Sequence, residues 1–120
     1  MALRQGQLEE AVDLLRECVP IAHDQFNLEY LAEGLTQVAA VAVRQCQYDR
    51  GAVVLGGSEA LLEGAGGARE PVWHELHEET VSLLQRELGD RLAVPRQEGR
   101  AMSADELVAC ALQFLDSTSA

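Results

Sequence analysis

The chain contains no lysine and few aromatic residues, and each of these absences excludes a class of function or fold. Its nine Lys and Arg positions are all arginine, which excludes a phosphate-loop lysine, a Schiff-base lysine and a lysine general base. Aromatic residues make up 4% of the sequence, although hydrophobic residues make up 48%. The core must therefore be built from Leu, Val and Ala, which suits close packing between helices better than a β-sandwich.

Positive charge is scarce relative to negative charge. The 120 residues include 20 acidic and 9 basic side chains, which gives a formal net charge of -11. Such a surface repels nucleic-acid backbones and anionic membranes, so we expect neither as a direct partner. The sequence shows no apolar segment of a signal peptide and no run of about 18 apolar residues, the length that a transmembrane helix needs. A cytoplasmic location is therefore expected.

The three cysteines form no recognisable redox or zinc motif. Cys18, Cys46 and Cys110 are widely spaced and include no C-x-x-C pair. Cys18 and Cys110 lie beside apolar residues at helical spacing, where a thiol usually packs as a small hydrophobic group. We therefore expect these two thiols to be buried.

Apolar residues recur at intervals of three and four, which predicts helices along the chain. The segment "VAAVAV" (38–43) is apolar on nearly every side and should be covered on more than one face. Ser103 and Glu106 fit a capping box at the start of the last predicted helix, whereas Pro95 allows only short helical pieces on either side. No stretch alternates as a strand would. We predict one all-α domain over 1–120, with about six helices and antiparallel neighbours.

Two segments of the chain are similar to each other. "GQLEEAVDLL" (6–15) aligns with "CQYDRGAVVL" (46–55), so that Ala11 matches Gly51 and Leu15 matches Leu55. A small residue four positions before a large apolar one resembles the second helix of a tetratricopeptide repeat (TPR). The resemblance implies TPR-like antiparallel helix pairs stacked into an α-α superhelix.

A longer similarity covers roughly residues 28–115. The residues that carry it are Leu55, Gly56, Ser58, Glu59, Ala60 and Leu61 in one motif and Gly99, Arg100, Met102, Ser103 and Glu106 in another. Together they resemble the C-terminal TPR-like region of actinobacterial LuxR-type transcriptional regulators and related signal-transduction ATPases. This resemblance implies a scaffold without catalysis, made of an orphan second helix (7–23), a helix pair (27–64) and C-terminal capping helices (71–116).

An orphan helix would leave part of its apolar face without a neighbour. Repeat helices bury their faces on adjacent helices, so an uncovered stripe should drive self-association as a homodimer. The residues of that stripe are Leu8, Val12, Leu15 and Val19.

The resemblance also suggests where a protein partner would bind. First helices line the concave groove of TPR folds, and residues 27–44 would form such a helix. The candidate partner-binding residues are Asn27, Tyr30, Glu33, Gln37 and Arg44.

The segment "PVWHELHEET" (71–80) places two histidines among glutamates and could suggest a metal site. His74 and His77 are three residues apart, whereas zinc proteases use H-E-x-x-H, and two ligands do not make a site. An amphipathic helix explains the pattern better, with its His and Glu side chains facing water. Its core-facing residues would be Trp73, Leu76, Thr80 and Leu83.

The favoured function is protein–protein interaction or self-assembly, without enzymatic activity and with neither metal nor cofactor. Two alternatives stay open: a small-molecule sensing pocket within the helical repeat, and a metal-dependent enzyme using His74 and His77. Spacing alone also permits a Cys–His nucleophile, but few positive charges are available to lower the pKa of a thiol. "GAGG" (64–67) follows a predicted helix and is interpreted as a loop.

Overall fold

Helices make up nearly all of the described part of the chain. The computed structural model describes residues 5–25, 27–66 and 71–118, with side-chain surroundings for 9–25, 27–66 and 73–117. No strand occurs within these ranges, which confirms the all-α prediction. The elements are α1 (Gln5–Asp24), α2 (Leu28–Arg44), α3 (Tyr48–Gly64), α4 (Pro71–Leu88), the 3-10 turn η1 (Gly89–Leu92), α5 (Ala93–Ala101) and α6 (Ala104–Thr118).

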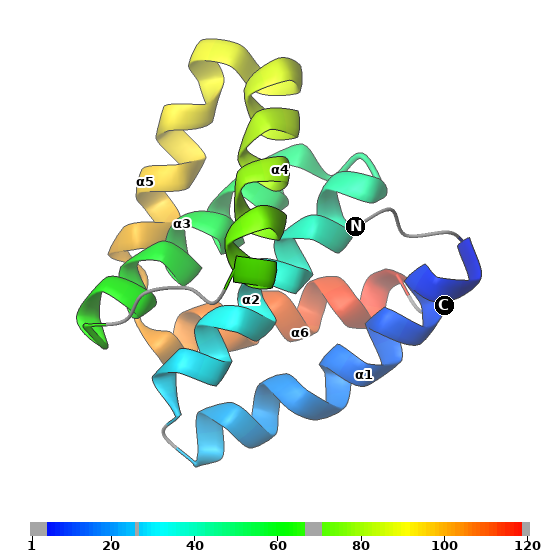
Figure 1. Cartoon of the computed structure of the whole chain (residues 1–120), viewed down its shortest axis with the longest axis vertical. Helices are drawn as coiled ribbons and strands as arrows, with labels where there is room; N and C mark the ends of the chain where they lie inside the picture. The colour runs from blue at the N-terminus through cyan, green and yellow to red at the C-terminus, as the bar shows by residue number, and fades with distance from the viewer. Residues whose placement is uncertain (1–4, 26, 67–70, 119–120) are drawn as a thin grey trace.

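Helix α2 lies at the centre of the fold, where it contacts α1, α3, α4 and α6 (Figure 1). Every residue of its apolar run 38–43 is buried. A helix that is apolar on all sides needs neighbours on several faces, and α2 has them. The prediction that this segment would be covered on more than one face is confirmed.

Helices α3 and α5 pack closely because glycines lie where they meet. A Cβ atom on Gly99 would lie 1.7 Å from the carbonyl oxygen of Val53, and one on Gly56 would lie 2.0 Å from that of Arg96. Neither position therefore has room for a side chain. Because α3 also packs on α2, this crossing connects α5 to the centre of the fold.

Pro95 lies within α5 instead of separating two helical pieces. The helix spans nine residues and begins at Ala93, which places Pro95 in its first turn. Backbone N–H groups in the first turn have no acceptor inside the helix, so the missing N–H of proline costs nothing there.

The expected capping box of α6 is confirmed. The backbone N–H of Ser103 donates to Oε1 of Glu106 at 2.9 Å, and the N–H of Glu106 donates to Oγ of Ser103 at 3.2 Å. The two residues thus satisfy each other's backbone donors at the start of the helix.

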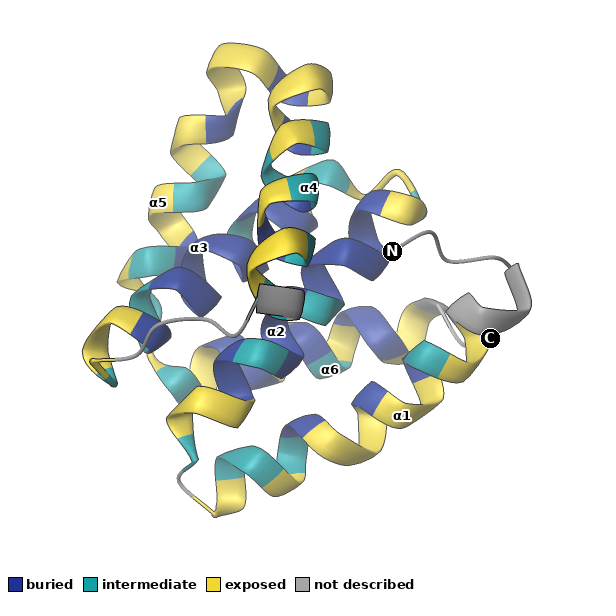
Figure 2. Cartoon of the chain, viewed as in Figure 1, coloured by how far each residue is buried: buried dark blue, intermediate teal, exposed yellow. Residues whose placement is uncertain are grey.

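Helix α1 is not an orphan, because α6 returns to cover it. Figure 1 shows the two helices at the same end of the molecule, and α1 contacts both α2 and α6. Val12, Leu15 and Val19 are 3%, 3% and 1% exposed, and Figure 2 shows buried residues along α1. The expectation that these three residues are partly bare is therefore wrong, whereas self-association of the chain stays a prediction. The side chain of Leu8 lies outside the described residues.

An ion pair and a side-chain hydrogen bond accompany the contact between the first and last helices. Arg16 Nε lies 3.1 Å from a carboxylate oxygen of Asp116, and His23 Nε2 lies 2.6 Å from one of Asp105. In a linear repeat array each repeat contacts only its neighbours in sequence. The α1–α6 contact joins elements at opposite ends of the described chain, so the helices here close on themselves.

Candidate functional site

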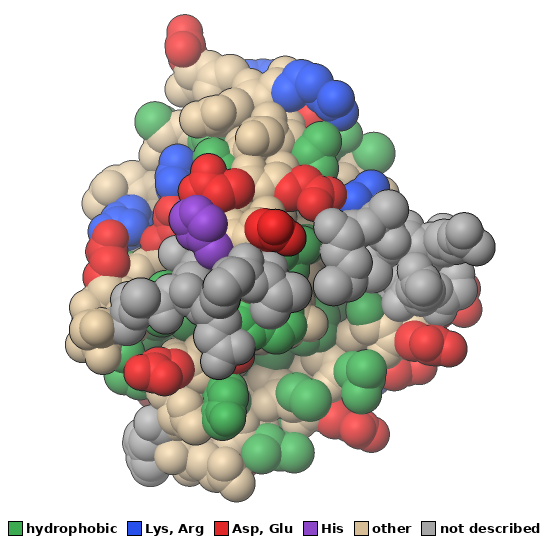
Figure 3. Space-filling view, in the orientation of Figure 1, with side chains coloured by type: hydrophobic (Ala, Val, Ile, Leu, Met, Phe, Trp, Pro, Cys, Tyr) green, Lys and Arg blue, Asp and Glu red, His purple; other side chains and the backbone are tan. Residues whose placement is uncertain are grey.

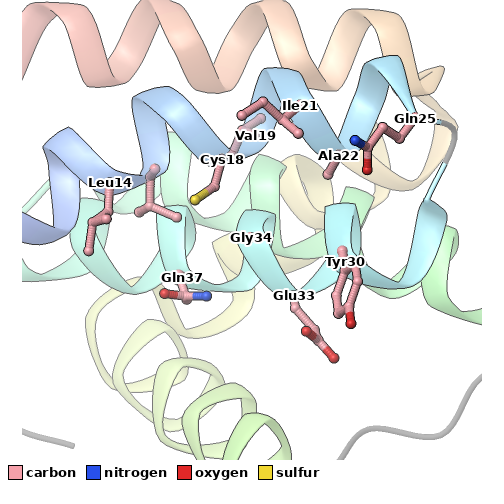
Figure 4. Close-up of a pocket in the computed structure, with 11 residues that line it drawn as sticks. Leu14, Cys18, Val19, Ile21, Ala22, Gln25, Tyr30, Glu33, Gly34 and Gln37 are labelled. Carbon is pink, nitrogen blue, oxygen red and sulfur yellow. The ribbon is translucent and has the colours of Figure 1, made fainter.

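A groove between α1 and α2 gathers apolar side chains that face solvent (Figure 4). Its volume is about 370 Å³. Leu14, Ile21 and Tyr30 lie along it and are 60%, 55% and 64% exposed. Apolar residues exposed together on a surface are more informative than single ones, because such patches mark interaction sites. The complete lining is Leu14, Leu15, Cys18, Val19, Ile21, Ala22, Gln25, Tyr30, Glu33, Gly34 and Gln37.

The wall formed by α1 exists because this helix carries a second apolar row. Leu14, Cys18 and Ile21 follow one another at intervals of four and three, so they share one face of the helix. That face adjoins the core-facing row, from which the buried Leu15 and Val19 also line the groove. The apolar arc of α1 is therefore wider than the contact with α2 and α6 covers.

Three of the five predicted partner-binding residues lie in this groove. Tyr30, Glu33 and Gln37 line it from α2. Asn27 instead caps α2, because its side-chain oxygen accepts the backbone N–H of Tyr30 at 3.2 Å. Arg44 donates to Glu79 on α4 at 2.9 Å, away from the groove lining.

Part of the α1 wall was not predicted from the sequence. Cys18 was expected to be buried but is exposed in the groove, where Figure 4 shows it on the same stretch of helix as Leu14 and Ile21. Leu14 and Ile21 were not singled out. Their spacing of seven residues, with Cys18 between them, was a readable signal of a second apolar row.

A second polar arrangement, the Glu59 cluster, joins three helices. Glu59 on α3 accepts a hydrogen bond from Arg96 Nε on α5 at 2.8 Å, and its other oxygen lies 2.9 Å from His77 Nε2 on α4. Arg96 also donates through its guanidinium tip to that second oxygen. Glu59 and His77 are each 8% exposed, so the expectation that His77 faces water is wrong. The buried carboxylate on the adjacent helix explains why a histidine is placed there.

The surroundings of Glu59 keep it ionised. Burial by itself would raise the pKa of this carboxyl, but the hydrogen bonds and charges of Arg96 and His77 outweigh it and lower the pKa from 4.5 to about 2. The carboxylate in turn raises the pKa of Arg96 through the same hydrogen bonds. The contacts of Glu59 with His77 and Arg96 thus connect α3 to α4 and α5. Neither Glu59 nor His77 lines the α1/α2 groove.

The two histidines of the 71–80 segment have different surroundings. His77 is buried against Glu59, whereas the side chain of His74 is 61% exposed and lies 3.9 Å from Glu78. Thr80 is buried as predicted, and Leu76 and Leu83 are half-buried. Over the ranges that the structure describes, no three His, Cys, Asp or Glu side chains come together as metal ligands would.

The cysteine–histidine pairs permitted by spacing have other environments. His23 contacts Asp105 on α6. Burial raises the pKa of the Cys110 thiol, which is the opposite of the change that activates a nucleophile.

None of the helices, over the described residues, is both long and apolar enough to cross a membrane. Comparisons with known proteins found no match, whether to a protein-family model, a curated protein or a solved structure. The resemblance to TPR-like regions of bacterial regulators therefore stays a prediction from the sequence motifs.

Proposed function

We propose that this chain is a protein–protein interaction module whose α1/α2 groove receives an apolar helical segment of a partner. The observation that carries the proposal is the exposure of Leu14, Ile21 and Tyr30 along one groove. Burying a large aliphatic side chain gains roughly 1.5–3 kcal/mol relative to leaving it in water. A partner that covers this wall therefore gains binding energy without any change in the core.

The form of the groove favours a helix as its occupant. The groove runs between two helices: α1 contributes most of its apolar residues, and α2 contributes Tyr30 and Gly34 next to the polar Glu33 and Gln37. An amphipathic helix bound in a groove uses residues spaced by three, four and seven as its anchors. Leu14, Cys18 and Ile21 show the same spacing on the receiving side, so successive anchors can meet successive wall residues.

The wider context that we propose is the C-terminal TPR-like region of a bacterial transcriptional regulator in the cytoplasm. Its support is the pair of sequence motifs together with their positions in the fold. Gly99 lies at the crossing of α3 and α5, and Ser103 and Glu106 cap α6. Gly99 lets two helices pack closely, and Ser103 and Glu106 stabilise the start of a third helix, which are structural roles expected of a scaffold. The antiparallel pair α2–α3 is the part that a TPR-like unit would comprise.

A binding experiment with a defined probe tests the groove. The probe is a fluorescently labelled helical peptide of about 15 residues, built from Ala and Gln with leucines at helical spacing. We expect the double variant Leu14→Gln, Ile21→Gln to weaken its binding at least about tenfold, measured by fluorescence anisotropy. The free energy of unfolding should change by no more than about 0.5 kcal/mol, because both side chains are exposed.

Val94→Gln supplies the matched control. Val94 is 65% exposed on α5 and lies outside the groove lining, so its replacement removes a similar exposed apolar side chain elsewhere. Equal loss of binding in the control and in the double variant would show that the peptide recognises exposed apolar surface in general. No detectable binding to the unaltered chain would count against the proposed function.

A small apolar ligand is the second candidate occupant. The groove volume of about 370 Å³ falls within the range of small-molecule sites. A compound that raises the thermal stability of the unaltered chain but not that of the Leu14→Gln, Ile21→Gln variant, with no binding of the helical peptide, would favour this candidate.

A further inference from the structure

Carboxylates lie along the exposed apolar row of α1 that consists of Leu14, Cys18 and Ile21. We call these carboxylates the acidic row. Glu10 lies four residues before Leu14, and Glu17 lies three residues after Leu14 and four before Ile21. Residues three and four apart are neighbours on a helix surface, so the carboxylates lie directly beside the apolar side chains. The complete acidic row is Glu10, Asp13, Glu17 and Asp24, all of them exposed.

The opposite side of the groove is also acidic. Glu33 on α2 lines it, and the exposed Glu29 lies one helical turn before Glu33. The described lining residues include no arginine. On the face drawn in Figure 3, apolar and acidic side chains lie over α1 and α2 in the lower half, and acidic side chains also occur in the upper half, whereas the arginine side chains seen on this face lie in the upper half.

The arginines that the structure places in ion pairs are directed toward other parts of the molecule. Arg16 pairs with Asp116 on α6, Arg44 with Glu79 on α4, and Arg96 with Glu59 on α3. The groove therefore combines an apolar centre with negative borders. Complementary charge at the edge of an interface selects partners and speeds their association.

We propose that the partner segment is a basic amphipathic helix, with apolar anchors along one face and arginine or lysine residues beside them. This inference rests on the proposed function of the groove and specifies its partner. The anchors pack between α1 and α2, and the flanking cations meet the acidic row and Glu29. A second copy of this chain is a poor occupant, because the same acidic borders would face each other and like charges repel.

Three versions of the helical peptide test the charge of the partner. They share the same leucines and carry arginine, glutamine or glutamate at the flanking positions. We expect the arginine version to bind roughly tenfold more tightly than the glutamine version at about 50 mM salt, and the glutamate version to bind least. The advantage of arginine should shrink strongly at about 0.5 M salt, since exposed charges are then screened.

Variants of the protein that lack the charges of the acidic row test whether these carboxylates cause the preference for the arginine peptide. We expect the quadruple variant Glu10→Gln, Asp13→Asn, Glu17→Gln, Asp24→Asn to lose the preference for arginine and to keep its affinity for the glutamine version. The control removes the same number of exposed charges elsewhere, as Glu75→Gln, Glu87→Gln, Asp90→Asn, Glu98→Gln. The control should retain most of the preference, because these positions lie on α4, η1 and α5 and not on the two helices that form the groove.

The outcomes separate this inference from the proposed function. Equal affinity for the arginine and glutamine versions overturns the basic partner and leaves the groove as an apolar docking site. An equal loss of preference in the two quadruple variants overturns it as well, because net charge alone would then explain the effect. Absence of binding by all three peptides overturns the proposed function itself. A dimer in light scattering that Leu14→Gln, Ile21→Gln dissociates would identify a second copy as the occupant.

Discussion

Replacing Gly99 by alanine is expected to destabilise the chain by about 3–5 kcal/mol, a large part of the stability of a small domain. The added Cβ would lie 1.7 Å from the carbonyl oxygen of Val53 and 3.0 Å from the backbone nitrogen of Gly57. These atoms belong to the backbone of α3, so a change of side-chain rotamer cannot relieve the overlap. Helix α5 would have to move away from α3, which also disturbs the ion pair between Arg96 and Glu59.

Gly64→Ala is the control for this substitution. Gly64 is the last residue of α3, and a Cβ there would meet nothing within 4 Å. Alanine has the higher helix propensity, so this variant should be unchanged or more stable by up to about 1 kcal/mol. Urea denaturation followed by circular dichroism compares the two variants. A Gly99→Ala chain within about 1 kcal/mol of the unaltered chain would mean that α3 and α5 do not touch as described.

Removing the charge of Glu59 is expected to cause the second large decrease in the free energy of unfolding. Glu59→Gln leaves Arg96 partly buried beside a neutral amide, and it removes the carboxylate that His77 contacts. Breaking a buried ion pair by neutralising one partner costs about 3–5 kcal/mol, and partial exposure of the Arg96 side chain (30%) places this case near the lower end. Urea denaturation near neutral pH measures the loss.

The same carboxylate predicts how stability depends on pH. The pKa of Glu59 is about 2 in the folded chain, below its ordinary value of 4.5, so the folded state favours the ionised form. Its contribution of about 3 kcal/mol is therefore fully present above pH 4.5 and is lost as the pH falls from 4.5 toward 2. The Glu59→Gln chain should show a smaller loss of stability over this interval.

Glu63→Gln provides the matched control, one helical turn further along α3. Glu63 pairs with Arg100 as Glu59 pairs with Arg96, but its side chain is 65% exposed. An ion pair in solvent contributes about 0–1 kcal/mol, so this variant should be nearly as stable as the unaltered chain. Similar losses for the two variants would show that burial is not what makes the Glu59 cluster important.

The local features of the fold could be predicted from the sequence, because they depend on neighbouring residues. Apolar residues spaced by three and four predicted the helices, and the all-apolar run 38–43 predicted that α2 is covered on several faces. Ser103 and Glu106 predicted the cap of α6. The contact of α1 with α6 could not be predicted in this way. It joins the two ends of the chain, and no local pattern distinguishes a helix covered by a distant neighbour from one without a partner.

The candidate site was predicted in part for a related reason. Tyr30, Glu33 and Gln37 were predicted, by resemblance, to line the concave groove of a TPR fold; they line the groove between α1 and α2, and their part in binding stays a prediction. The wall formed by α1 was not predicted, because only the core-facing apolar residues of this helix were considered. The apolar surface of α1 also includes the exposed Leu14 and Ile21. His77 was assigned to water because only its own helix was considered. Glu59, a lone acid among the buried apolar residues of α3, was the signal of a buried partner.

The central claim is that a partner helix binds between α1 and α2, and amide chemical-shift mapping tests it most directly. The uncharged leucine peptide is titrated into isotopically labelled protein, and the backbone amide shifts are followed by NMR. We predict that the largest changes fall within 14–25 and 30–37, the segments that contain the groove lining. Changes centred on α4 and α5, with little effect on these two segments, would contradict the claim.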